Sequence, residues 1–547
     1  MNNYDTYYPR PLLKRDSFLC LNDGWKLNGY PINVPFPPEA EESFYDWPIE
    51  GKLEYEKHFT VPQGFYSYND KVIINFGAVD QVCDVYLNDK LLLHHEGGYL
   101  PFRIEVQDYL EEKNTLKVIA SDELDSFYPY GKQTKNPKGM WYTPVSGIWQ
   151  SVWLEAYDKK GIDDLLISTD MDSVKLHIES ISNTFEISFD GFNETFNRND
   201  ISIRISNPIL WSPDHPHLYE MTISTGTDTI TSYFALKKFK KRIVNGHPRL
   251  FLNNKPFFVN GLLDQGYFPD GIFLPKDIED YRQDILNMKE LGYNCLRKHI
   301  KIEPEVFYHE CDKLGMVVIQ DMVNSGKYSF LVDTILPTIG LSKFPKPVAD
   351  KKRYEFFLQH AKDTINHLKS HPCILGYTIY NEGWGQQAAD QTYDVLKPLD
   401  AERFFDTTSG WFAEEKSDFD SYHIYFRNKV LEGTSERMLF LSECGGFIRN
   451  IAEHKSDKGS KWGYGSANNE EELTDKIIEM HDKMVIPSIK NGLVALIMTQ
   501  ISDVEGEING LYTYDRKVCK VNKEKILEAN KRLKELYEET CIDEDGI

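Results

Sequence analysis

Apolar and polar residues alternate in short runs through the first part of the chain, and turn residues separate these runs. Between residues 19 and 155 the runs include 55–61, 72–76 and 83–87, and the turn pair Asn88-Asp89 follows the last of them. Such runs are typical of strands that bury one face of a sheet. The pattern predicts an antiparallel β-sandwich for residues 1–155.

A second set of strand-like runs lies between residues 156 and 241. It includes 174–178 and 185–189, and a Pro-rich stretch at 207–213 precedes a further run at 218–223. Several short strands with turn signals between them are typical of a sandwich. We therefore expect a smaller, immunoglobulin-like β-sandwich at 156–241.

After Pro256, strand-like runs alternate with amphipathic helical segments. In one of these segments Tyr281, Ile285 and Met288 lie on the same helical face. The eight strand candidates are residues 257–263, 294–299, 317–321, 374–381, 404–408, 421–425, 438–443 and 493–500. Strands that alternate with helices in this way predict a (β/α)₈ TIM barrel for residues 242–547. The predicted fold class is multidomain, with β-sandwiches and one α/β barrel.

The length of the chain and its net charge limit the number of domains and the kinds of binding partner to be expected. The chain has 547 residues, which is too many for one hydrophobic core, and its formal net charge is −23. Proteins that bind phosphate backbones or anionic membranes do so through clusters of Lys and Arg, and a strongly negative net charge opposes such binding. We therefore expect a neutral substrate and neither a nucleic-acid nor a membrane partner. A homo-oligomer remains possible.

The cysteines and the N-terminal residues bear on localisation. The eight cysteines form no closely spaced pairs, and several lie in apolar runs, as expected for free thiols in a reducing compartment. Residues 1–19 contain several charged residues and no continuous apolar run of the kind found in secretory signals. These features predict a cytoplasmic protein.

Two carboxylates stand at the ends of predicted barrel strands. Glu382 follows the apolar run 373–380 and Asn381, and Glu443 follows 438–442. The C-terminal ends of barrel strands form the active site in proteins of this fold. Cleavage of a glycosidic bond needs one acid to protonate the leaving oxygen and one carboxylate to attack or stabilise the anomeric carbon. We predict that both glutamates are catalytic; the alternatives are a helix-capping Glu382 and a buried, ion-paired Glu443.

Other polar residues at strand ends complete the predicted site. Arg297, at the end of strand two, is expected to keep Glu443 ionised. Tyr425 and His423 point to the same side of strand six, where Tyr425 is expected to donate to Glu443 and His423 to bind a sugar hydroxyl. Trp384 is expected to offer an aromatic face to a sugar ring. The further substrate-binding candidates are Asn381, Asp264, His299, Gln500 and Asp503.

Motifs for cofactor chemistry are absent from the sequence. The chain lacks the phosphate loop Gly-x-x-x-x-Gly-Lys and the dinucleotide motif Gly-x-Gly-x-x-Gly. We therefore expect no cofactor. We also expect no catalytic metal, because no cluster of His and Asp with metal-ligand spacing stands out.

Many segments resemble glycoside hydrolase family 2, the family of β-galactosidases, β-glucuronidases and β-mannosidases. In the barrel these are Gly292-Tyr293-Asn294 with Arg297, Cys311-Asp312-Lys313-Leu314-Gly315, Asn381-Glu382 and Ser442-Glu443. In the sandwiches they are Asp23-Gly24-Trp25, residues 55–62, 85–88 and 146–155, and Leu210-Trp211-Ser212-Pro213 with 216–219. The resemblance implies a jelly-roll sugar-binding domain, an immunoglobulin-like sandwich, a (β/α)₈ barrel and retention of configuration. It also implies that Glu382 is the acid/base, Glu443 the nucleophile, Asn381 the ligand of the sugar 2-hydroxyl and Tyr425 a contact of the nucleophile.

Two segments depart from the pattern of that family. Gln320-Asp321-Met322 stands where many members carry Asp-Glu, and the magnesium ligands of large β-galactosidases are not evident. At the end of strand eight, residues 499–503 replace a segment that contains tryptophan in many members. Because the magnesium ligands are not evident, the comparison with that family implies no metal site in this chain.

Substrate preference is read from a third segment. Glu507 and Asn509 occupy the places of the Asn-x-Lys pair that binds the substrate carboxylate in β-glucuronidases. Because a carboxylate repels a uronate, we expect an exo-acting hydrolase of terminal neutral β-linked sugars, β-galactosides first, that works by double displacement. The alternatives are a transglycosylase, a non-catalytic carbohydrate-binding protein, and a β-uronidase that uses another cation, such as Lys298, Lys301 or Arg449.

Overall fold

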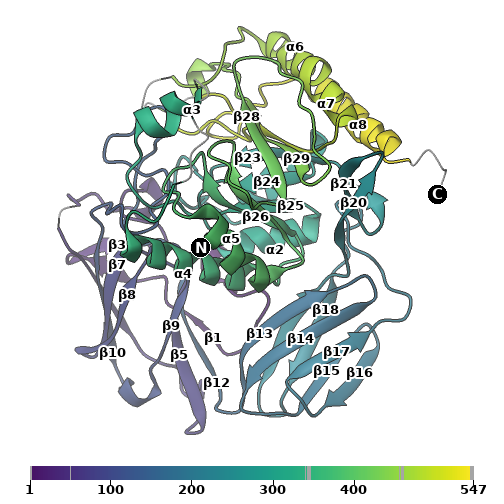
Figure 1. Ribbon diagram of the computed structural model, residues 1–547. Coiled ribbons are helices and arrows are strands. Elements are labelled where there is room, and N and C mark those ends of the chain that lie inside the picture. Colours follow the sequence, from purple (N-terminus) through teal and green to yellow (C-terminus); the bar gives the residue numbers. More distant parts are fainter. Residues whose placement is uncertain are drawn as a thin grey trace.

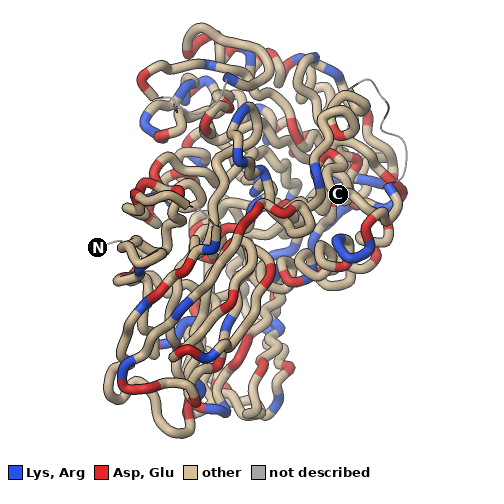
Figure 2. The backbone as a smooth tube through the Cα atoms, turned by 90° about the vertical axis from the view of Figure 1, so that its left-hand side faces the viewer, with Lys and Arg blue, Asp and Glu red and all other residues tan. Residues whose placement is uncertain are grey.

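The computed structural model describes residues 3–49, 51–338, 341, 346–454, 456 and 461–542. Figure 1 shows two β-sandwiches in the lower half of the molecule and an α/β barrel above them. In the view of Figure 2, acidic and basic residues are interspersed over all three parts. Within the described residues, no helix is both long enough and apolar enough to cross a membrane.

The first sandwich consists of two antiparallel sheets. The four-stranded sheet has the order β1 (Phe18–Cys20), β12 (Val152–Asp158), β5 (Asp70–Phe76), β9 (Phe102–Glu105). The six-stranded sheet has the order β3 (Tyr30–Ile32), β2 (Trp25–Leu27), β4 (Leu53–Phe59), β10 (Asn114–Ser121), β7 (Val82–Leu87), β8 (Lys90–Glu96). In β10 every second residue is buried, so Leu116, Val118 and Ala120 enter the core between the sheets. The sandwich predicted from alternating residues is confirmed.

The second sandwich is smaller and also antiparallel. One sheet has the order β13 (Ile162–Thr169), β14 (Ser173–Ser180), β17 (Asp200–Arg204). The other has the order β16 (Phe192–Phe196), β15 (Phe185–Phe189), β18 (Tyr219–Ser224), β19 (Thr229–Phe234). Its core is separate from that of the first sandwich. The immunoglobulin-like sandwich is therefore also confirmed.

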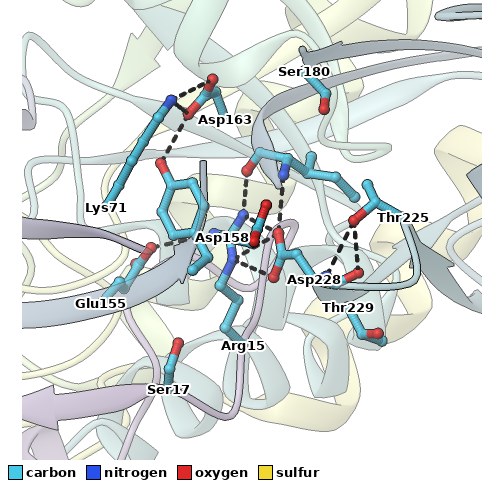
Figure 3. Close-up of polar contacts among 12 residues, drawn as sticks. Arg15, Ser17, Lys71, Glu155, Asp158, Asp163, Ser180, Thr225, Asp228 and Thr229 are labelled. Carbon is cyan, nitrogen blue, oxygen red and sulfur yellow. Dashed lines mark hydrogen bonds and ion pairs between the residues drawn. The ribbon is translucent and has the colours of Figure 1, made fainter. Parts of the chain in front are cut away.

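Arg15 is buried between the two sandwiches (Figure 3). Its guanidinium lies 3.0 Å from Asp228 of the second sandwich and 3.3 Å from Glu155 of the first. It also lies over the ring of Tyr157, 4.0 Å from the centroid. The segment that precedes β1 thus joins the sandwiches through one buried cation that two carboxylates share.

Replacement of Arg15 by Met should lower the free energy of unfolding by about 3–5 kcal/mol, because it leaves Asp228 buried without a cation and Glu155 with only Arg10, at 3.9 Å. Chemical denaturation measures this change in the transition of the sandwiches. The control is Arg204→Met, which removes an exposed ion pair with Asp172 at 2.9 Å. It should leave the transition nearly unchanged. Equal effects of the two substitutions would show that Arg15 does not stabilise the junction.

Eight parallel strands form the barrel, and all eight correspond to predicted strands. Their order in the sheet is β27 (Phe404–Ser409), β26 (Ile374–Asn381), β25 (Val317–Asp321), β24 (Cys295–Lys298), β23 (Val259–Asp264), β30 (Leu493–Thr499), β29 (Met438–Gly445), β28 (Phe419–Ile424). The Asp418 amide, just before β28, donates to the Phe405 carbonyl of β27 at 2.9 Å, so the two ends of the sheet meet. A hairpin of β20 (Phe239–Val244) and β21 (His247–Leu252), extended by β22 (Lys255–Pro256), precedes the barrel.

The predicted alternation of a helix after every strand is wrong at two places. Besides the short α3 (Leu336–Thr338), the helices are α1 (Glu279–Glu290), α2 (Glu305–Leu314), α4 (Lys351–Leu368), α5 (Ala389–Leu396), α6 (Glu470–Met480) with α7 (Ile486–Lys490), and α8 (Lys523–Thr540). Residues 410–418 and 425–437, all of them described, connect β27 to β28 and β28 to β29 without a helix. The first connection is shorter than the roughly dozen residues that a crossover helix needs. The second contains Gly433-Thr434-Ser435, which are weak helix formers.

Candidate active site

Glu382 and Glu443 converge at the C-terminal mouth of the barrel. Nδ1 of His423 lies 2.8 Å from Oε1 of Glu382 and 3.4 Å from Oε2 of Glu443. One carboxylate oxygen of Glu382, one of Glu443 and a ring nitrogen of His423 all lie within 4.8 Å of one another. The two carboxylates are therefore close enough to act on one sugar ring.

The end of β26 presents Glu382 to the mouth of the barrel. The buried strand ends at Asn381, and Glu382 then adopts a left-handed backbone conformation with φ 54°, followed by Gly383 with φ 71°. The Glu382 amide donates to the Ser409 carbonyl at 2.9 Å, which holds the turn against β27. Left-handed φ values are uncommon for residues other than glycine and occur at functional sites, where the surrounding structure holds them.

Glu443 is buried and paired with donors on both oxygens. Arg297 donates from Nη1 to Oε1 at 3.2 Å, and the Tyr425 hydroxyl donates to Oε2. Burial alone would raise the pKa of Glu443, but the electrostatic effects of neighbouring groups, His423 and Arg297 foremost, outweigh it and lower the pKa to about 2. Glu443 is therefore an ionised carboxylate at neutral pH, and the predicted contacts of Arg297 and Tyr425 with it are confirmed.

Arg297 also fixes the neighbouring polar groups. Its Nε donates to Oδ1 of Asp321 at 2.9 Å, and its Nη2 donates to Oδ1 of Asn381 at 2.9 Å. Because a guanidinium can only donate, the Asn381 oxygen must face it, and the Asn381 amide nitrogen remains without a partner within the described residues. Asn381 is thus oriented to donate to a sugar hydroxyl, as the family resemblance implies.

Asp321 is a site residue that the sequence reasoning missed. Besides its bond with Arg297, its Oδ2 lies 2.8 Å from Nδ1 of His299. Burial and the charge of Lys132 lower the pKa of His299 to about 4, so the ring is neutral at pH 7 and Nδ1 carries its proton toward Asp321. The signal was available, since Asp321 ends strand three as the other candidates end theirs.

His423 lies in the site but does not face a sugar. Its Nδ1 meets Glu382 at 2.8 Å, and its Nε2 lies 3.1 Å from Oγ of Ser409. The ring is fully buried. The predicted bond from His423 to a sugar hydroxyl is therefore wrong, because both ring nitrogens are already engaged. The histidine instead positions the two carboxylates.

Trp384 does not offer an open aromatic face. The side chain is 2% exposed, it packs against Tyr130 and Trp141 at centroid distances of 5.5 and 5.1 Å, and its Nε1 donates to the Gly326 carbonyl. The predicted sugar platform at Trp384 is wrong, because this large apolar ring is more stable inside the aromatic cluster. Trp411 is partly exposed, and its ring centroid lies 5.9 Å from that of His423.

Three other predicted substrate ligands are occupied by internal contacts. Asp264 pairs with Lys298 at 2.7 Å, and Asp503 pairs with Lys520 at 2.6 Å. Gln500 is fully buried and donates to Asn509 at 2.8 Å. The structure brings none of them to Glu382 or Glu443, so their prediction as substrate ligands is wrong. A buried carboxylate needs a cation, and the nearest lysine supplies it.

The first sandwich and the loop after β29 form further walls of the mouth, which the sequence reasoning also missed. Tyr464 stacks on Tyr425 with ring centroids 3.8 Å apart. Tyr142 of the sandwich donates its hydroxyl to Glu507, and the Thr143 amide donates to Glu505 at 3.1 Å. No local signal in the sequence connects these segments, because they meet through the tertiary fold.

Glu382, His423 and Glu443 have the donor types and spacing to hold a metal ion. However, Arg297 and Tyr425 already donate to both oxygens of Glu443, and a divalent cation would lie against a guanidinium. The chain also contains one His-x-x-x-His spacing, His367 to His371. There His371 bonds to Asp312 at 2.7 Å in the barrel core, away from the carboxylates.

Comparison with known families agrees with this architecture along most of the chain. Residues 30–154 match the glycosyl hydrolase 2 galactose-binding domain-like model. Residues 167–237 match glycosyl hydrolases family 2, and residues 244–440 match the TIM barrel domain of the same family.

Individual relatives are distant. A β-galactosidase of Thermoanaerobacter pseudethanolicus is 26% identical over 66% of this chain and 49% of its own length. A β-glucuronidase of Streptococcus agalactiae is 23% identical over 64% of this chain and 61% of its own length. The chain thus spans about half to three fifths of these two relatives' length.

Solved structures share the fold at still lower identity. A β-D-glucuronidase of Dictyoglomus thermophilum superposes with a TM-score of 0.72 at 17% identity, over 96% of this chain and 98% of its own. A β-galacturonidase of Eisenbergiella tayi superposes with a TM-score of 0.70 at 15% identity, over 97% and 99%. With three matched domains in the family's order and a pair of carboxylates at the barrel mouth, the chain belongs to glycoside hydrolase family 2.

Proposed function

We propose that this chain is a retaining exo-β-glycosidase that works by double displacement. The observation that carries the proposal is the distance between the two carboxylates, whose nearest ligand oxygens lie within 4.8 Å. Retaining glycosidases hold their carboxyl groups about 5–5.5 Å apart, whereas inverting ones leave about 6.5–9.5 Å for a water molecule. The short distance favours direct attack by a carboxylate.

The environments of the two glutamates suit different roles. Glu443 is ionised and fixed by Arg297 and Tyr425, so it attacks the anomeric carbon and becomes a glycosyl ester. Glu382 is the more exposed of the two side chains, at 14% against 6%. It gives its proton to the leaving oxygen, and it then removes a proton from the water that releases the sugar.

The stereochemistry of the first product tests this proposal. With a nitrophenyl β-glycoside as substrate, proton NMR during the first minutes should show the β-anomer of the free sugar, which then mutarotates. Initial release of the α-anomer would contradict double displacement. If an added acceptor sugar captures most of the glycosyl group in place of water, the chain is a transglycosylase with the same intermediate.

A neutral β-galactoside is the first candidate substrate. Glu507 and Asn509 lie at the barrel mouth where a uronate-binding pair would be expected, and Asn509 donates to Glu507 at 3.0 Å. A buried carboxylate at this position disfavours a second carboxylate on the substrate. The β-galactosidases among the relatives are consistent with this preference.

A β-uronide is the second candidate, and Lys132 is the observation that favours it. Lys298 and Lys301 both pair with Glu303, at 2.7 and 2.8 Å, and Arg449 donates to a backbone carbonyl. Lys132 is partly buried, and its ammonium group has no partner within the described residues. Its charge nevertheless acts on the buried His299 and Glu443.

The backbone holds Lys132 beside the barrel mouth. The Gly131 amide donates to the Asn324 carbonyl at 3.4 Å, and the Lys132 carbonyl accepts from Tyr142 at 3.0 Å. A side chain built on Gly131 would lie 3.1 Å from the Ile300 carbonyl, next to His299. This cation from the first sandwich is therefore available to an anionic group of the substrate.

Comparison of Lys132→Met with wild type on nitrophenyl β-galactoside, β-glucuronide and β-galacturonide separates the two candidates. If a uronide is the substrate, its kcat/KM should fall about 10- to 100-fold in the variant, because a charge-assisted hydrogen bond is lost. The galactoside rate should change much less. The control is Lys135→Met, because Lys135 lies in the same loop but is exposed and pairs with Glu123. Equal losses on neutral and acidic substrates would exclude direct recognition of a carboxylate by Lys132.

A further inference from the structure

A cavity of about 470 Å³ lies where the three domains meet the N-terminal segment. Its walls include Tyr4, Gln150 of the first sandwich, Asp164 of the second, and Glu305 and His367 of the barrel domain. None of the residues that line the cavity belongs to the candidate active site. The cavity is therefore separate from the candidate active site. Its volume falls in the range of about 300–1,000 Å³ that is typical of small-molecule sites.

Gln150 is the first sign of a ligand in this cavity. The residue is 8% exposed and lines the cavity, yet its side-chain amide forms no hydrogen bond within the described residues. Its amide atoms keep some exposure, so they face the cavity and not the closed protein interior. Gln150 therefore offers an unused donor and an unused acceptor to whatever occupies the cavity.

Glu305 is the second sign. Its carboxyl lies 3.9 Å from Nδ1 of His367, beyond hydrogen-bond distance, and its side chain is 12% exposed. Burial raises the pKa of Glu305 to about 7 and lowers the pKa of His367 to about 3. At pH 7 the Glu305 carboxyl is therefore about half protonated and His367 is neutral, so this part of the wall can both donate and accept hydrogen bonds.

The remaining walls are balanced in charge and partly aromatic. Arg10 lies 3.4 Å from Asp164 and 3.9 Å from Glu155, so its charge is compensated. Phe102 and Trp153 contribute aromatic surface. Amide and carboxyl groups that can donate and accept hydrogen bonds suit the hydroxyls of a polyol, and aromatic faces suit the C–H faces of a sugar ring. We propose that the cavity binds a neutral mono- or disaccharide that bridges all three domains.

Binding at this place has a consequence for stability. The occupant contacts residues of the first sandwich, the second sandwich and the barrel domain, so it stabilises their arrangement in the folded protein. The thermal midpoint should therefore rise with the concentration of the saccharide. This effect does not depend on the catalytic proposal, because maltose is α-linked and would not be consumed by a β-glycosidase.

Calorimetric titration with maltose, galactose and galacturonic acid tests the proposal on the full chain. Gln150→Leu removes the unused amide while keeping a similar volume, and Glu305→Gln keeps hydrogen bonding but removes the titrating carboxyl. Maltose or galactose should bind the wild type, and Gln150→Leu should weaken that binding about tenfold or more. Glu305→Gln should weaken it less. Both variants should hydrolyse nitrophenyl glycosides at the wild-type rate.

Three outcomes would overturn the proposal. Absence of binding by both neutral sugars would mean that the cavity holds water. Binding that both variants leave unchanged would place the sugar elsewhere, including the active site. Tighter binding of galacturonic acid than of the neutral sugars would show that the chemical class is wrong. Failure of the catalytic proposal would appear instead as a wild-type chain that cleaves no nitrophenyl glycoside, whatever the calorimetry shows.

Discussion

Replacement of Glu443 by Gln should lower kcat about 10⁴-fold or more on every β-glycoside that the wild-type chain cleaves. An amide cannot form the glycosyl ester, and its NH₂ group would face Arg297 or Tyr425, both of which donate to the carboxylate. Steady-state rates of nitrophenolate release measure the loss. Thermal unfolding of the same preparation should show a folded protein.

The control for Glu443 is Glu414→Gln. Glu414 lies in the connection after β27 and accepts from Gln386 at 3.0 Å, but it contacts neither catalytic glutamate within the described residues. Its substitution should change kcat by no more than a few-fold. A Glu443→Gln variant that keeps a tenth or more of the wild-type rate would remove the nucleophile from the mechanism.

Replacement of Glu382 by Gln should produce losses that depend on the leaving group. For substrates with poorly acidic leaving alcohols, kcat/KM should fall about 10²- to 10⁴-fold, because no acid protonates the departing oxygen. For dinitrophenyl glycosides the loss in glycosyl transfer should be much smaller, since that leaving group departs as an anion. The amide can still bond to His423 at the position where Nδ1 meets the carboxylate at 2.8 Å. The fold of the site is therefore preserved.

A series of aryl β-glycosides with leaving groups of rising pKa measures this dependence. The slope of log kcat/KM against leaving-group pKa should be steeper for Glu382→Gln than for wild type. Small anions such as azide should accelerate the variant by replacing the water that Glu382 no longer activates. Parallel slopes for the two proteins would contradict the acid role of Glu382.

The contacts of Arg297 explain how one guanidinium could serve both halves of the proposed mechanism. It reaches Glu443, Asn381 and Asp321 at once, and it is fully buried. A side chain held by three partners keeps Glu443 ionised and also orients the side-chain amide of Asn381. Catalysis by positioned charges needs this kind of preorganisation, since no movement of the donors is then required during the reaction.

Several features could be predicted from the amino-acid sequence alone because they depend on local pattern. Alternating and continuous apolar runs located all eight barrel strands, and the polar residues at the ends of these strands identified Glu382, Glu443 and Arg297 at the mouth. This works because parallel strands in a closed barrel all present their C-terminal ends on the same side. A residue at the end of such a strand lies at the barrel mouth because of its position in the chain, and this does not depend on which residues from distant segments pack against it.

Other features were decided by the tertiary structure, because they depend on partners from distant segments. Asp264 and Asp503 end up beside Lys298 and Lys520 rather than near a sugar, and Trp384 enters an aromatic cluster that the first sandwich helps to build. Conversely, Lys132 reaches the barrel mouth from another domain. A polar or aromatic side chain is buried favourably only where a matching residue packs against it or pairs with it. The packing of the domains determines which residue that is.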